Sequence, residues 1–121
     1  MVLPASALDR VVAAKTEEAV EMLRKSALLC RLAEQIALIL SDTIGEGAPF
    51  DPVRLEAVDD PEEDWLELVF TIPLRGNLKD AWRWQLRIAE GEVELHRRLP
   101  EEERRFLARY VGVHVIPSEI Q

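Results

Sequence analysis

The side chains in this sequence that could do chemistry are few, and the first to consider are one thiol and one imidazole. Cys30 is the only cysteine, so it has no partner for an internal disulfide, which is compatible with a reducing compartment. A thiol becomes a nucleophile where positive charge favours its thiolate. Cys30 instead lies on the apolar side of a helical pattern with no histidine near it in sequence, so we expect a packed thiol. His96 has no second ligand at helical spacing, and we expect a core or boundary residue rather than a metal ligand.

A second candidate is the pair Arg109 and His114, which form an Arg-x4-His spacing. This spacing resembles the nuclease motif of HEPN-family RNases, and the resemblance implies that both side chains act on an RNA phosphate. In that family the motif lies on a helix, whereas Gly112 and the valines beside it indicate that the helix has ended here. We favour the alternative, a surface arginine and a strand-edge histidine, so no catalytic residue is predicted.

The net charge of −8 is concentrated in the middle of the chain. Residues 45–75 carry two arginines against nine carboxylates, a balance of −7. Repulsion from phosphate groups opposes nucleic-acid binding, which we do not expect. The acidic run from Asp59 to Asp64 lacks the alternating spacing of a calcium loop, and no histidine or cysteine lies near it for zinc. We interpret it as a solvated turn, and we predict no metal, cofactor or small-molecule ligand.

The composition is that of a globular chain, with 121 residues, 48% hydrophobic and 31% charged. We expect a single domain over residues 1–121. The apolar runs are too short to span a bilayer, and charged residues come too early for a secretory signal. We therefore expect a cytoplasmic protein that is not inserted in a membrane.

The most unusual segment is the first third of the chain, because residues 5–44 contain neither glycine nor proline. Apolar residues recur there at three- and four-residue steps, which predicts one helix over residues 6–44. Such a helix would be about 60 Å long, whereas a domain of this size is roughly 35 Å across. The main alternative is a break near Lys15 and Thr16, because Thr16 with the two glutamates after it would make a new helix start.

The remaining elements come from shorter patterns. Alternating apolar residues on both sides of the acidic turn predict an antiparallel β-hairpin over residues 52–73, and a β-branched run predicts a short third strand over 113–116. Residues 77–99 are ambiguous, because Trp82 to Ile88 also alternate as in a strand. A helix explains more of this segment, so we predict helices over 77–99 and 101–111. The predicted class is α+β, with helices packed on the sheet.

The run DPEEDWLELVF and the amphipathic helix after it resemble small uncharacterised bacterial proteins found in toxin–antitoxin-like gene pairs. The resemblance implies a role in binding a partner and carries over no catalytic residue. The overlong first helix and the wide apolar arc of the later helix point the same way, because together they offer more apolar surface than a small sheet can cover. We therefore predict a non-enzymatic interaction module that self-associates or binds an antitoxin-like or chaperone-like partner. The predicted contact residues are Leu8, Val12, Ala19, Met22, Trp82 and Trp84.

Overall fold

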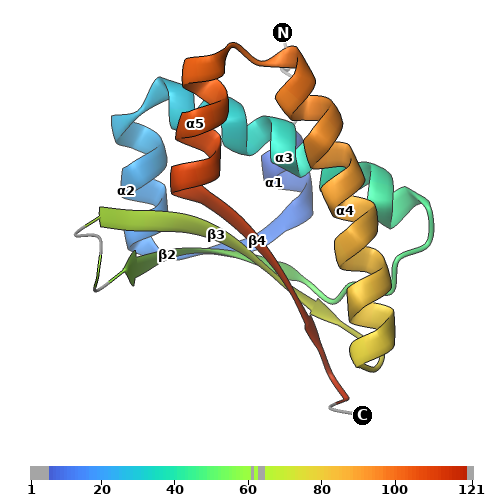
Figure 1. The fold of residues 1–121 in the computed structure, drawn as a ribbon. Helices are drawn as coiled ribbons and strands as arrows, with labels where there is room; N and C mark the ends of the chain where they lie inside the picture. Colours follow the sequence, from blue (N-terminus) through green and yellow to red (C-terminus); the bar gives the residue numbers. More distant parts are fainter. Residues whose placement is uncertain (1–5, 61, 63–64, 120–121) are drawn as a thin grey trace, which may run out of the picture.

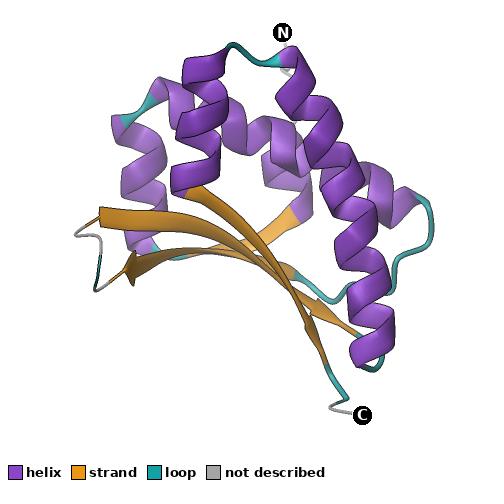
Figure 2. Cartoon of the chain, in the orientation of Figure 1, coloured by secondary structure: helices purple, strands orange, loops and turns teal. Residues whose placement is uncertain are grey.

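A computed structural model describes residues 6–60, 62 and 65–119, and shows helices layered on one face of a curved sheet (Figures 1 and 2). In chain order the elements are α1 (Ala7–Val11), β1 (Val12–Lys15), α2 (Glu17–Lys25), α3 (Ala27–Gly45), β2 (Val53–Asp60), β3 (Trp65–Leu74), α4 (Leu78–Arg98), α5 (Glu101–Tyr110) and β4 (Val111–Pro117). The strand order is β1-β2-β3-β4. The central pair β2–β3 is antiparallel, and each outer pair is parallel. The α+β class is confirmed.

The prediction of one helix over residues 6–44 is wrong, because the segment forms the three helices α1, α2 and α3, with the strand β1 between the first two. The alternative break is confirmed: Thr16 caps α2, its hydroxyl accepting from the Ala19 N–H at 3.2 Å. A second break, which was not predicted, lies at Ser26. Its backbone is extended, and its hydroxyl caps the start of α3. These caps give α2 and α3 their own starts, and both α1 and α2 pack against α3 instead of leaving the domain as a rod.

The hairpin and the third strand form as predicted, with wider bounds for the third strand. Along β3, Leu68, Phe70 and Ile72 are fully buried and face the helices, as strand alternation requires. The strand β4 runs parallel to β3 from Val111, earlier than residue 113. The strand β1 was not predicted. It pairs with β2 and forms one edge of the sheet, while β4 forms the other.

The ambiguous segment is a helix, α4, and the prediction over residues 77–99 is confirmed. Asn77 and Asp80 form a reciprocal capping box at its start. Its buried side, which includes Ile88 and Leu95, packs on the core. Gly91 allows α4 to approach α3 closely, because a Cβ there would lie 2.7 Å from Ile39 Cγ2.

The structure also bears on membrane insertion. Within the described residues, no helix combines the length and the apolar character needed to cross a bilayer.

Candidate interaction surface

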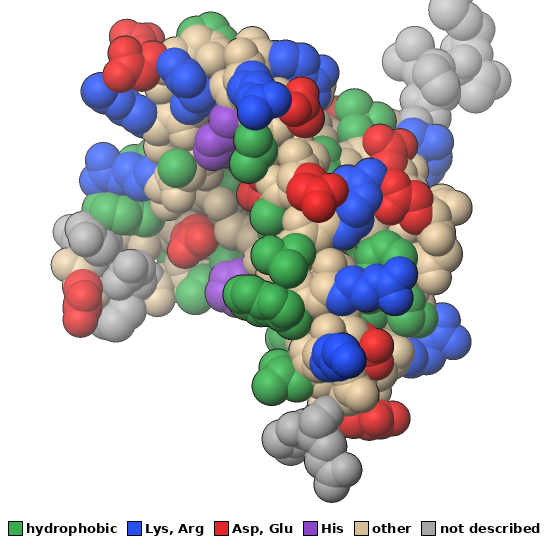
Figure 3. All heavy atoms as spheres, turned by 45° about the vertical axis from the view of Figure 1, so that its right-hand side comes forward, with side chains coloured by type: hydrophobic (Ala, Val, Ile, Leu, Met, Phe, Trp, Pro, Cys, Tyr) green, Lys and Arg blue, Asp and Glu red, His purple; other side chains and the backbone are tan. Residues whose placement is uncertain are grey.

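Four of the exposed large apolar side chains of the described residues lie on α4, including the three most exposed ones. Leu78, Trp82, Leu86 and Val93 are 61%, 64%, 47% and 53% exposed. Their spacing of four, four and seven residues places them on one side of the helix, roughly opposite Ile88 and Leu95. We call these four residues the α4 stripe. Figure 3, which brings α4 forward, shows hydrophobic side chains in a band on this face of the molecule.

Charged residues border the α4 stripe along its outer flank. Lys79 and Arg83 lie in the first half of α4, and Glu90 and Glu94 lie in the second half. All four are exposed. A shallow depression on this flank is lined by Lys79, Arg83, Glu90 and the stripe residue Trp82, among others. The surface therefore has an apolar centre with a charged rim, the arrangement found at protein interfaces.

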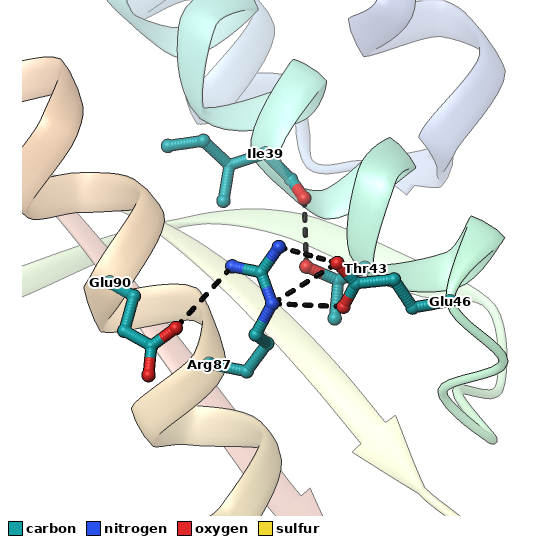
Figure 4. A network of polar contacts seen from close by, with 5 residues as sticks. All are labelled: Ile39, Thr43, Glu46, Arg87 and Glu90. Atoms are coloured by element: carbon teal, nitrogen blue, oxygen red, sulfur yellow. Dashed lines mark hydrogen bonds and ion pairs between the residues drawn. The ribbon is translucent and has the colours of Figure 1, made fainter.

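A polar clamp holds α4 against the end of α3 (Figure 4). The Arg87 guanidinium donates from Nε to both oxygens of Glu46, at 2.9 and 3.1 Å, and from Nη2 to Oε1. This carboxylate holds the pKa of Arg87 above its ordinary value. Nearby, the buried Thr43 hydroxyl donates to the Ile39 carbonyl at 2.8 Å, so it needs no further partner. The clamp fixes the position of the helix that carries the stripe.

The other flank of α4 is joined to the open edge of the sheet by Gln85. Its Nε2 donates to the Val113 carbonyl at 3.3 Å, and its Oε1 accepts from the Val115 N–H at 3.0 Å. Because β4 is an edge strand, these backbone groups would otherwise be available to pair with another strand. Gln85 therefore occupies the middle of this edge. Glu92 lies two turns further along the same side of α4, and burial raises the pKa of its carboxyl.

Of the six predicted contact residues, only one belongs to the stripe. Leu8, Val12 and Ala19 are buried in the core of the chain itself, so their prediction as contact residues is wrong. Met22 is half-buried against that core. Trp84 is half-buried, and the centre of its ring lies 6.2 Å from the centre of the Phe50 ring. Of the six predicted residues, only Trp82 belongs to the α4 stripe and is exposed there. The other stripe residues belong to the wide apolar arc of this helix, and the sequence alone does not show which part of that arc remains exposed.

The structure gives Arg109 and His114 separate surroundings. The Arg109 guanidinium carbon lies 3.9 Å from the centre of the Trp65 ring, a cation–π contact. His114 is exposed on the face of the sheet away from the helices, because Val113 and Val115 on either side of it pack toward the core. No hydrogen bond or ring contact joins Arg109 to His114 in the described part of the chain.

Two further candidates are settled by burial. Cys30 is exposed, so the prediction of a packed thiol is wrong. The buried side of α3 includes Leu29 and Ala33, and Cys30 falls outside it. His96 is half-buried on α4, a boundary residue as expected. Among the residues that the structure describes, no group of three or more histidine, cysteine or acidic side chains could hold a metal ion.

Comparison with known proteins gave no match: no family model, curated protein or solved structure is significantly similar to the chain.

Proposed function

We propose that the chain is a non-enzymatic protein–protein interaction module that binds its partner through the α4 stripe. The observation that carries the proposal is Trp82, a large aromatic side chain that is 64% exposed between two exposed leucines on one helix face. Isolated exposed apolar residues are ordinary, whereas a continuous row of them with a polar border is typical of a contact surface.

Two features of α4 support this reading. First, the helix is firmly positioned, because Ile88 and Leu95 on its buried side pack in the core and Gln85 joins it to β4. A rigid surface loses little conformational entropy on binding. Second, tryptophan is among the residues that contribute most to binding free energy at interface centres.

The proposal is tested by association that depends on Trp82. Sedimentation velocity on the purified chain from micromolar to millimolar concentration measures self-association, and crosslinking in cells followed by mass spectrometry measures capture of another protein. We expect at least one of the two, and we expect Trp82→Ser to abolish it. A chain that stays monomeric at 1 mM and yields no Trp82-dependent crosslink would overturn the proposal.

The matched control is Val58→Thr, because Val58 is also exposed, at 43%, but lies on β2 rather than on α4. This change removes apolar surface and keeps the β-branched shape. It should leave association unchanged. Both variants should unfold at nearly the wild-type temperature, since neither side chain is buried.

A further inference from the structure

We infer that the partner of the α4 stripe is a second copy of this chain, whose α4 packs antiparallel to the first across a two-fold axis near the middle of the helix. The inference rests on the proposed function and names the occupant of the same surface. It comes from the order of charges and of side-chain sizes along α4. In both respects, the helix is complementary to a second copy of itself that runs in the opposite direction.

The charges on the outer flank are self-complementary. Over residues 79–94 the unshared charges of this flank are Lys79, Arg83, Glu90 and Glu94, so two cations are followed by two anions. Arg87 is bound to Glu46, and Arg97 follows on the same flank beyond the paired positions. In an antiparallel helix pair each flank faces the same flank of its partner, with the residue order reversed. Arg83 then faces Glu90 of the second copy, and Lys79 faces Glu94, and the symmetry repeats each contact. Within one chain Glu94 is paired with Arg97, but such exposed ion pairs are weak and exchange partners readily.

The sizes of the side chains on this face are complementary with the two-fold axis placed one residue further along α4, a shift of about 1.5 Å. The large stripe residues Trp82 and Leu86 lie in the first half of α4, while the stripe residue Val93 and the half-buried Ala89 beside the stripe lie in the second half. Reversing the helix places Trp82 opposite Val93 and Leu86 opposite Ala89 of the second copy. Large side chains thus meet small ones at these two levels, which is how packed helix surfaces interdigitate.

The sheet edge offers the second copy no comparable route. Pairing of β4 with another β4 would need the backbone groups of Val113 and Val115 that Gln85 already engages, and β4 ends in Pro117, which has no N–H to donate. Association between copies is therefore expected through α4 and not by extension of the sheet at β4.

The test exchanges the charges between two variants. In Arg83→Glu, both contacts of a homodimer join two carboxylates, and in Glu90→Arg both join two guanidinium groups. When the two variants are mixed, every contact in the heterodimer is again between opposite charges. We expect each variant alone to dimerise roughly thirtyfold more weakly than wild type, as reversal of two exposed pairs implies, and the equimolar mixture to regain the wild-type dissociation constant.

Sedimentation equilibrium of each variant and of the mixture, with one variant carrying a mass tag, measures these constants. A second arm uses Leu86→Ala, which opens a gap opposite Ala89 and should weaken the wild-type dimer at least tenfold. Repeating the mixing in high salt should reduce the advantage of the heterodimer, because the contacts are exposed.

The outcomes separate this inference from the proposed function. Recovery on mixing supports the antiparallel dimer. A wild-type dimer without recovery on mixing overturns the register and leaves the proposed function in place. A wild-type monomer with Trp82-dependent capture of another protein overturns the second copy as occupant and again leaves the function. Absence of both overturns the inference and the function together.

Discussion

Replacement of Gln85 by alanine tests the assignment of this side chain to the open edge of β4. The change removes two hydrogen bonds, one to the Val113 carbonyl and one from the Val115 N–H. Each hydrogen bond contributes about 0.5–1.5 kcal/mol net, and water can reach part of the uncovered edge. We therefore expect Gln85→Ala to lower the free energy of unfolding by about 1–2 kcal/mol, and the midpoint of thermal unfolding by roughly 5 °C.

Amide hydrogen exchange followed by NMR gives a more specific readout than stability. The Val115 N–H donates to Gln85 Oε1, so its protection depends on that contact. The N–H of His114 points toward β3 by strand alternation and serves as the internal control. In Gln85→Ala, exchange at Val115 should accelerate while that at His114 changes only as much as global stability does.

The matched variant is Gln85→Glu, which keeps an acceptor for Val115 and loses the donor to Val113. It should retain protection at Val115 and lose stability. Gln85→Ala should also precipitate more readily, since an uncovered edge strand can pair with other chains. If exchange at Val115 and the free energy of unfolding both match wild type in Gln85→Ala, Gln85 does not cover this edge.

Three further predictions concern the contact between α4 and α3, the carboxyl group of Glu92, and two helix caps. Gly91→Ala gains about 1 kcal/mol of helix propensity, but its Cβ would lie 2.7 Å from Ile39 Cγ2, and overpacking costs about 1–3 kcal/mol; urea denaturation should show net destabilisation, and a stabilised variant would contradict the close approach. Burial raises the pKa of Glu92, so its folded form holds the proton to higher pH than its unfolded form and the group destabilises the fold as pH rises; Glu92→Gln should raise the melting temperature at pH 7, with no gain below the ordinary titration range of glutamate. Thr16→Ala and Ser26→Ala each remove a helix cap and should cost about 1 kcal/mol in chemical denaturation; a Ser26→Ala variant as stable as wild type would argue against the second break.

The sequence was sufficient for the elements whose local signals agree with their burial. In the hairpin, alternation of apolar residues coincides with the face of β3 that packs on the helices, where Leu68, Phe70 and Ile72 are fully buried. In α4, the capping residue Asn77 and the helical arc agree, and they outweigh the strand-like alternation around Trp84. These elements need no information from the rest of the chain to be recognised.

The prediction for the N-terminal third of the chain failed for the opposite reason, because local signals and burial do not agree there. Residues 5–44 contain no helix-breaking residue, so nothing local requires the break at Ser26. The break is stabilised by the serine cap together with tertiary contacts, since Leu8 and Ala19 reach the core only if the chain folds back. The strand β1 was not predicted for the same reason, because only pairing with β2 gives its four residues an extended structure.

The contact surface was only partly predictable because a single apolar arc on α4 serves two surfaces. Gln85 and Glu92 are polar residues inside that arc. A helix that buried the whole arc against the core would bury these two polar side chains as well. In the structure they lie between the core side, with Ile88 and Leu95, and the exposed side, with Trp82 and Leu86. A wide apolar arc divided by a line of polar residues thus indicates a helix that packs on its own core with one part and leaves the other part for a partner. By this argument Gln85 locates the boundary of the stripe as well as the edge of the sheet.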